Sequence, residues 1–265
     1  MTNLAIIGGS GFGALAHLEQ ETQQLVDTPY GKPSGSIVLG YLGEQLVVFI
    51  SRHGQNHHLP PHQINYRANI WALQQIGVEK IVAVNSVGGI HPSMGPTHIC
   101  IPDQLIDYTW GREHTFVPND SNRIKSVGML ESSNRLGSVT HIDFTDPFSN
   151  RLRTILIEHL KTMNFPFSPS GVYGCTQGPR LETAAEIKRL QRDGCDLVGM
   201  TAMPEAALAK ELGIDYACVC LVVNWAAGVT TEKITMAEIQ AAITIGFERV
   251  NTLFRKSLTD LAINN

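Results

Sequence analysis

A chain of 265 residues is long enough to bury the core of one large domain or two small ones. With 17% charged residues, a formal net charge of -4 at pH 7 and a pI near 6.2, it lacks the basic excess that favours nucleic-acid or anionic-membrane partners. No apolar run reaches the roughly 18 residues of a membrane span, and no secretory leader or C-x-x-C pair accompanies the cysteines. We therefore expect a cytoplasmic protein that acts on small molecules.

In chain order, strand-like runs rich in Val, Ile and Cys alternate with helical patterns. Residues 19–33 are polar and turn-like, and residues 117–139 have the Ser and Asn content of a long surface loop or flap. Because the same alternation continues along the chain, we predict a single three-layer α/β domain over 1–265. The predicted strands are 3–8, 36–42, 44–51, 80–87, 97–107, 171–177, 196–200 and 215–224, and the predicted helices are 65–76, about 151–163, 182–192, 204–212 and 236–261.

The first predicted strand ends in a glycine-rich turn, "GGSGFG" at 8–13. Backbone N–H groups of such a turn commonly bind an anion. A dinucleotide would require G-x-G-x-x-G followed about 20 residues later by an acidic residue, and a nucleoside triphosphate would require a lysine after the last glycine. The turn fits neither pattern, which leaves a smaller anion near Ser10 or a tight turn without a ligand.

Two later clusters carry groups that suit a phosphate. Arg52 and His53 follow an apolar strand, and Thr201 precedes a helix, where its hydroxyl would lie beside partial positive charge. Taken singly, Arg52 could form only a surface salt bridge and Thr201 only a helix cap. Together with Ser10, they predict a site for one tetrahedral oxyanion.

The histidines of the same region raise the alternative of a metal site, because His53, His57, His58 and His62 are closely spaced. Two consecutive prolines at 60–61 would break any helix that presented them, and no paired carboxylate or cysteine completes a ligand set. We therefore predict phosphate contact or loop packing for these histidines, and no metal.

Several motifs together resemble the purine nucleoside phosphorylase family, and most closely its methylthio-nucleoside branch. They occur in the expected order over most of the chain: "IIGGSGFG", "DTPYGKPSG", "RHGQNHHLPPHQINYRANIWAL", "NSVGGI", "TQGPRLETAAE" and "GMTAMPEAALAKE". The resemblance implies a distorted, partly barrel-like mixed sheet flanked by helices, in a homotrimer or a dimer of trimers with sites near subunit interfaces. It also implies inorganic phosphate as co-substrate, with no other cofactor.

The resemblance also implies a role for individual residues. Phosphate would attack the anomeric carbon while the purine leaves from the opposite face, and the phosphate charge would stabilise an oxocarbenium-like sugar. Catalytic roles fall to Asn224 and His53. Phosphate binding falls to Ser10, Arg52, His53, Ser86 and Thr201, and substrate contacts fall to Asn85, Leu181, Glu182, Met200, Asn224, Trp225, Ala226, Met236 and His57.

Two of these positions bear on the choice of base. Asn224 stands where adenosine-type members carry aspartate, and its amide can donate to O6 of a 6-oxopurine and accept from a protonated N7. Glu182 is acceptor-only when ionised, which suits N1–H of hypoxanthine and opposes the lone pair of adenine. The alternative for Glu182 is a carboxylate in the first turn of a helix. Ala226 stands where adenosine-type enzymes carry a second aspartate. The bulky Trp225 stands where related sequences often carry proline or another residue.

The other end of the substrate is predicted from Met236, which falls where ordinary 6-oxopurine phosphorylases place a histidine. Its thioether and the neighbouring Ile239 suit a methylthio group better than a hydroxyl. The same two residues are also spaced like the apolar face of a helix. His57 and His141 are expected near this pocket, His141 from a neighbouring subunit.

These expectations together predict phosphorolysis of S-methyl-5′-thioinosine to hypoxanthine and 5-methylthioribose 1-phosphate. The alternatives are the same reaction on methylthioadenosine, or on inosine and guanosine. A nucleoside-binding protein without turnover is an alternative from another class, although a binder has no need of a phosphate site.

Overall fold

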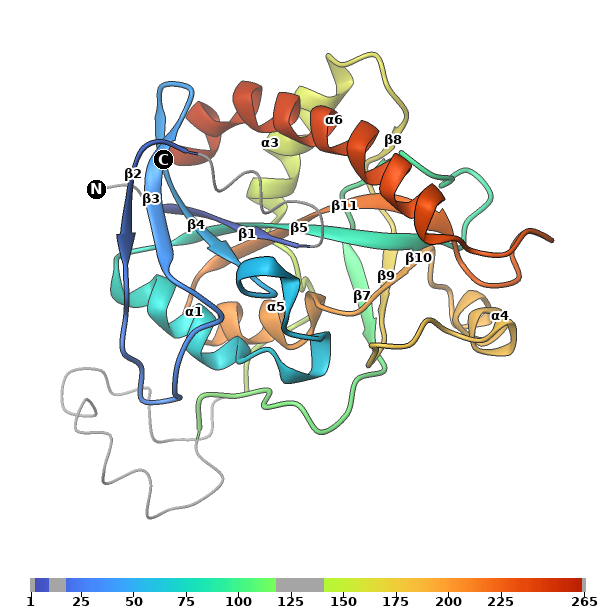
Figure 1. The fold of residues 1–265 in the computed structure, drawn as a ribbon, viewed down its shortest axis with the longest axis horizontal. Helices are drawn as coiled ribbons and strands as arrows, with labels where there is room; N and C mark the ends of the chain where they lie inside the picture. The colour runs from blue at the N-terminus through green and yellow to red at the C-terminus, as the bar shows by residue number, and fades with distance from the viewer. Residues whose placement is uncertain (1–2, 10–17, 118–140, 264–265) are drawn as a thin grey trace.

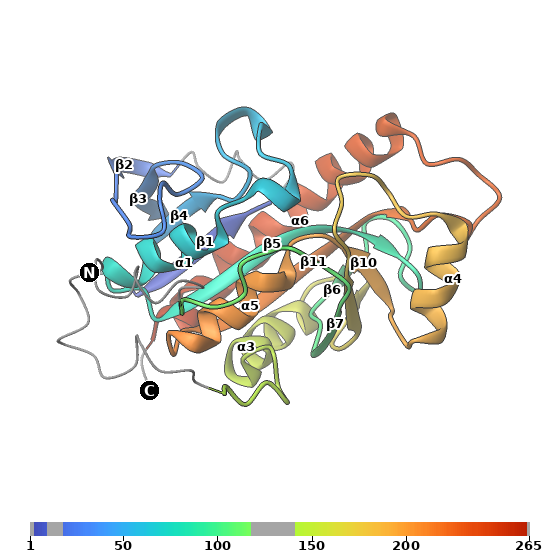
Figure 2. The ribbon, with the colours of Figure 1, turned by 90° about the horizontal axis from the view of Figure 1, so that it is seen from below.

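The computed structural model describes residues 3–9, 18–117 and 141–263 (Figure 1). Helices cover both faces of one mixed sheet, as the three-layer prediction requires. Helices α1 (Tyr66–Gln75) and α5 (Ala202–Glu211) pack together on one face, and α3 (Asn150–Lys161) and α6 (Met236–Ala262) pack on the other. Helix α4 (Ala184–Arg192) stands at one end of the sheet (Figure 2). No helix within the described ranges is long and apolar enough to cross a membrane.

The sheet of the described residues has 11 strands in the order β2-β3-β4-β1-β5-β10-β9-β7, with β11 paired to β5 and β6, and β6 paired to β8. It forks at β5, which pairs with β11 from Lys80 to Gly89, with β1 near its start at 80–83, and with β10 at its end at 88–89. The strands are β1 (Leu4–Gly8), β2 (Glu19–Gln24), β3 (Ile37–Leu42), β4 (Gln45–Ser51), β5 (Lys80–Gly89), β6 (Ile99–Cys100), β7 (Gln104–Asp107), β8 (Phe167–Ser168), β9 (Val172–Cys175), β10 (Leu197–Gly199) and β11 (Asp215–Trp225).

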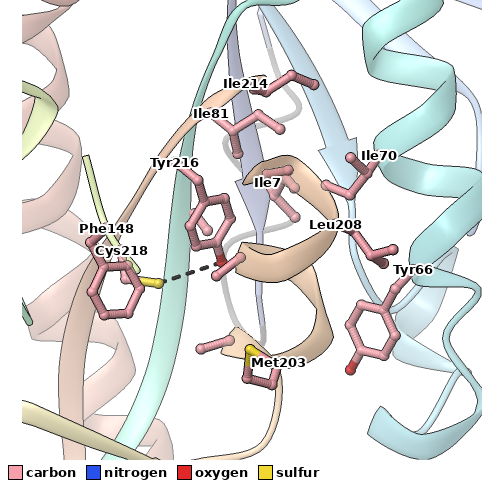
Figure 3. Packing of buried hydrophobic residues seen from close by; sticks show 14 of the residues in the cluster. Ile7, Tyr66, Ile70, Ile81, Phe148, Met203, Leu208, Ile214, Tyr216 and Cys218 are labelled. Carbon is pink, nitrogen blue, oxygen red and sulfur yellow. Dashed lines mark hydrogen bonds between the residues drawn. The ribbon is translucent and has the colours of Figure 1, made fainter. Parts of the chain in front are cut away.

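The central strands are apolar on both sides because each side faces a helical layer. In β11, Cys218 and Val222 pack toward α1 and α5, whereas Val219 and Leu221 pack toward α3 and α6. Figure 3 shows the first of these clusters, in which side chains of α1, α5, β1, β5 and β11 meet. The two clusters fix the sheet between its helices and hold the strand ends in place.

Two predicted elements differ from the structure, and a third falls almost wholly outside the described residues. Residues 19–24 were expected to be turn-like, but they form β2. Pairing with β3 supplies the backbone hydrogen bonds of this strand, even though its side chains are polar. The run predicted as one strand over 97–107 is two strands, β6 and β7, separated at Pro102, which has no N–H for a ladder. The predicted loop at 117–139 lies, apart from residue 117, outside the described residues.

Candidate functional site

A cavity of about 450 Å³ opens where several strands end. The glycine-rich turn contributes Gly9, and Ser10, the next residue, lies outside the described residues. The cavity brings together most of the predicted site residues. Those that line it are Arg52, His53, His57, Ser86, Leu181, Glu182, Met200, Thr201, Asn224, Ala226 and Met236.

Sheet topology explains why these residues meet. Strands β1, β4, β5 and β11 are parallel, so their carboxyl ends lie at the same edge of the sheet. Strand β10 runs antiparallel to β5, with Val198 opposite Gly88, so that the chain leaves β10 toward Asn85 and Ser86. In β11 the register shifts between Val222 and Asn224, and such an irregularity re-aims side chains at a strand end.

Arg52 is fully buried, which excludes the surface salt bridge considered above. Its Nε and Nη2 donate to the two carboxylate oxygens of Glu205 at 2.7 and 2.8 Å, and Nη1 donates to the Val84 carbonyl at 2.9 Å. Burial lowers the pKa of Arg52, but the charge and hydrogen bonds of Glu205 outweigh burial and raise it. The guanidinium is therefore a fixed cation with two N–H groups left for a ligand in the cavity.

Gly9 allows the glycine turn to approach this arginine. A Cβ atom on Gly9 would stand 2.5 Å from the Val84 carbonyl oxygen and 2.9 Å from Arg52 Nη1. Only glycine fits there without moving one of them. Gly9 is thus packed directly against the cation that is predicted to bind phosphate.

His53 presents a neutral ring to the cavity. Burial, and then the charge of Arg52, lower the pKa of His53 to about 3. Its Nδ1 lies 2.8 Å from the Leu59 carbonyl oxygen, which can only accept, so Nδ1 carries the proton and Nε2 is an acceptor. The ring of His57 lies beside it, with the centroids 4.1 Å apart.

Thr201 precedes α5 but forms no side-chain cap on it. Its hydroxyl oxygen instead accepts from Asn85 Nδ2 at 2.9 Å, and both side chains are buried. Because the oxygen already accepts, its proton is directed to another acceptor. Asn85 does not line the cavity itself, and its place is behind Thr201.

Asn224 and Glu182 both line the cavity. Asn224 Nδ2 donates to the Trp225 carbonyl at 2.7 Å, which leaves the second N–H and the amide oxygen for a ligand. Helix α4 begins at Ala184, and its capping box is formed by Thr183 and Glu186. Glu182 is therefore not part of the first turn, where the alternative interpretation placed it.

Met236 and Ile239 both line the cavity at the start of α6. The side chain of Met236 is 75% exposed, so it does not belong to the buried face of the helix, although Ile239 packs against the second core cluster. Leu181, 47% exposed, lies at the same cavity. His141 is exposed and does not line it within this chain.

Trp225, like Asn85, is a predicted contact that does not line the cavity. Its indole packs so closely on Gly95 that a Cβ there would stand 2.8 Å from Trp225 Cζ2. At Met200, the carbonyl already accepts from Arg112 Nη1 at 2.8 Å, so the N–H and side chain remain for the predicted ribose contact.

Two groups behind the site escaped the sequence analysis. The carboxylate of Glu205, besides holding Arg52, accepts from the Tyr216 hydroxyl at 2.8 Å. Arg112 donates to the carbonyls of Met200, Met203 and Gln177 at 2.6 to 2.8 Å. A charged residue inside the apolar helical run "AMPEAALA" was a usable signal for Glu205, whereas nothing local distinguishes Arg112. Among the described residues, no group of three or more His, Cys, Asp or Glu could hold a metal ion.

Residues 3–259 match the sequence pattern of the Phosphorylase superfamily. The chain is 53% identical over 259 residues to a probable S-methyl-5′-thioinosine phosphorylase of Pseudomonas syringae pv. tomato, covering 98% of this chain and 99% of that protein. It is 44% identical to a 6-oxopurine nucleoside phosphorylase of Pyrococcus furiosus, covering 90% of this chain and 85% of that one.

Among solved structures, a methylthioadenosine phosphorylase of Schistosoma mansoni in complex with adenine superposes with a TM-score of 0.89. The identity is 28%, and the match covers 100% of this chain and 93% of that one. The sheet, its helical layers and their order are therefore those of a nucleoside phosphorylase.

Proposed function

The chain belongs to the Phosphorylase superfamily, and we propose that it cleaves S-methyl-5′-thioinosine with inorganic phosphate. The products are hypoxanthine and 5-methylthioribose 1-phosphate. The proposal is supported by relatives at about 50% identity that carry this name in three bacterial genera. The family and its named members indicate a pentosyltransferase-type enzyme that uses phosphate as co-substrate.

The observation that carries the proposal is the distribution of donors and acceptors along one cavity. Arg52 and Thr201 offer hydrogen-bond donors in one part of the cavity, and Asn224 with Glu182 offers a donor and acceptors in another. The first set suits phosphate oxygens. The second set suits O6, N1–H and a protonated N7 of a 6-oxopurine, whereas an adenine N1 would face the Glu182 carboxylate lone pairs.

In this reaction a phosphate oxygen attacks the anomeric carbon as the bond to the purine nitrogen breaks. The neutral His53 accepts a hydrogen bond from a P–O–H group, because its Nε2 has no proton. Thr201 donates to another phosphate oxygen. Monohydrogen phosphate loses its proton when it forms the sugar ester, and the leaving purine takes up one proton at N7 through solvent, so the proton count balances. Asn224 accepts a hydrogen bond from N7–H as the purine leaves. The methylthio group lies against Met236 and Ile239.

The proposal extends to a homotrimer located in the cytoplasm. Three large apolar side chains near the site are exposed on one protomer: Met236 by 75%, Leu181 by 47% and Trp110 by 71%. Exposed apolar side chains of this size favour an interface with another subunit. Light scattering tests the assembly: a trimer has three times the 29.0 kDa of the chain, and a stable monomer contradicts this part of the proposal.

The experiment for the reaction measures purine release from methylthioinosine, methylthioadenosine and inosine, each with and without phosphate. Phosphate-dependent release that is fastest from methylthioinosine supports the proposal. Preference for methylthioadenosine contradicts the roles of Asn224 and Glu182, and preference for inosine contradicts the role of Met236. Binding without release contradicts the enzymatic function.

A further inference from the structure

Glu182 is a carboxylate on a loop, between the end of β9 and the start of α4. It separates the proposed active site from a second cavity of about 490 Å³, and it lines both. A glutamate in such a place has three rotatable side-chain bonds and loses rotamer freedom when it is fixed. Something must hold its carboxylate if it is to select one purine over another.

The side chain that holds it is Thr176. Thr176 Oγ1 donates to Glu182 Oε1 at 2.5 Å. A hydroxyl donating to a carboxylate at this length is a charge-assisted hydrogen bond, stronger than one between neutral groups. Of the two carboxylate oxygens, Oε1 is thereby engaged, and Oε2 remains to accept from a ligand.

Thr176 itself has a fixed backbone. It follows β9 directly, and its N–H donates to the Gly199 carbonyl of β10 at 2.8 Å. Its own carbonyl accepts from Arg112 Nη2 at 3.3 Å, and the same guanidinium holds the carbonyl of Gln177 at 2.8 Å. The hydroxyl therefore stands at a defined point, from which it holds the Glu182 carboxylate.

We propose that Thr176 is a positioning residue that sets the base selectivity of the site, by holding the Glu182 carboxylate as an acceptor that faces N1 of the purine. This inference rests on the proposed function for the identity of the base. A 6-oxopurine donates from N1–H, so it finds an acceptor in Oε2. Adenine has a lone pair at N1, so its binding requires the Glu182 carboxylate to turn away, and the hydrogen bond from Thr176 opposes that movement.

The geometry also provides a matched set of variants. Thr176→Val keeps the shape of the side chain and removes the donor, whereas Thr176→Ser keeps the donor. The Gly199 carbonyl lies 3.4 Å from Thr176 Oγ1, so the hydroxyl retains an acceptor when Glu182 is replaced by glutamine. Glu182→Gln is therefore a background in which the charge-assisted bond is absent.

The test measures dissociation constants of hypoxanthine and adenine for the intact protein by titration calorimetry, with phosphate present. We expect Thr176→Val to lower the preference for hypoxanthine over adenine by about tenfold, because the variant loses one hydrogen bond to a charged group. Thr176→Ser should retain the preference. In the Glu182→Gln background, Thr176→Val should leave the ratio unchanged.

An unchanged ratio in Thr176→Val, or an equal fall in Thr176→Ser, would overturn the inference. Thermal unfolding of each variant, and phosphate binding measured separately, distinguish a local change in base selectivity from a general loss of structure. Because base binding needs no turnover, failure of the proposed reaction shows up separately, in the assay of purine release by the unaltered protein. If the unaltered protein binds adenine as tightly as it binds hypoxanthine, the inference is overturned directly.

Discussion

Replacing Glu205 by alanine should destabilise the protein far more than replacing an exposed glutamate. Glu205 is fully buried and its carboxylate receives three hydrogen bonds, two from Arg52 and one from Tyr216. Its removal leaves the Arg52 cation without its counterion and the Tyr216 hydroxyl without its acceptor. Breaking a buried ion pair from one side costs about 3–5 kcal/mol.

The assay is urea unfolding followed by circular dichroism, with the free energy of unfolding taken from the midpoint and slope. The matched control is Glu113→Gln, whose carboxylate pairs with Arg67 at 3.2 Å but is 49% exposed. An exposed pair contributes about 0–1 kcal/mol. A loss below about 1 kcal/mol in Glu205→Ala, equal to that of the control, would refute the assignment of a buried charge pair.

A double variant separates loss of the pair from loss of one partner. Arg52→Met combined with Glu205→Leu replaces both charges by apolar groups, and such replacements are often neutral or stabilising. We therefore expect the double variant to be more stable than Glu205→Ala alone. It should nevertheless lose phosphate-dependent turnover, because the N–H groups of Arg52 that face the cavity are gone. A double variant less stable than the single one would contradict the argument.

Three further predictions concern individual site residues. Asn224→Asp should shift preference toward 6-aminopurines, because a carboxylate accepts from the exocyclic amino group; an unchanged ratio of purine-release rates from methylthioinosine and methylthioadenosine contradicts this. With the pKa of His53 lowered to about 3, the unfolded chain gains a proton below about pH 6.5 that the folded chain does not, so His53 costs stability as pH falls. When the pH is lowered from 7 to 5, the free energy of unfolding should therefore fall by about 2 kcal/mol less in His53→Asn than in the unaltered protein. Urea unfolding at pH 7 and at pH 5 measures this difference. Gly9→Ala should cost about 1–3 kcal/mol and raise the KM for phosphate, because its Cβ overlaps the Val84 carbonyl; unchanged stability and KM contradict the close packing of the turn.

The fold could be predicted from sequence wherever burial produces a pattern. The strands β1, β5 and β11 were readable because residues on both of their faces are apolar, and α6 because its buried residues recur at helical spacing. Strand β2 was not readable, since its six residues are polar and its partner strand alone determines its conformation. The forked pairing at β5 depends on segments far apart in the chain, and no local pattern encodes it.

Most residues of the candidate site could be predicted from the sequence, but the partners that set the charges of Arg52 and His53 could not. Motif resemblance named the residues that line the cavity, because such residues cluster at strand ends. The partners that fix those residues come from distant segments: Glu205 lies 153 positions from Arg52, and Thr201 lies 116 positions from Asn85. A sequence presents such partners as ordinary helix or strand residues.

The charges around the phosphate position explain how the site serves the proposed reaction. Glu205 offsets the charge of Arg52, and the low pKa of His53 keeps its ring neutral. Thr201, which also lines the cavity, is a neutral donor. Phosphate held in this way retains most of its negative charge, and that charge lies next to the anomeric carbon as positive charge develops on the sugar. A site with two unpaired cations would bind phosphate more tightly, but it would neutralise the charge that stabilises the transition state. If the proposed reaction is correct, we therefore expect the buried carboxylate of Glu205 to favour catalysis, because its negative charge offsets the positive charge of Arg52 beside the phosphate.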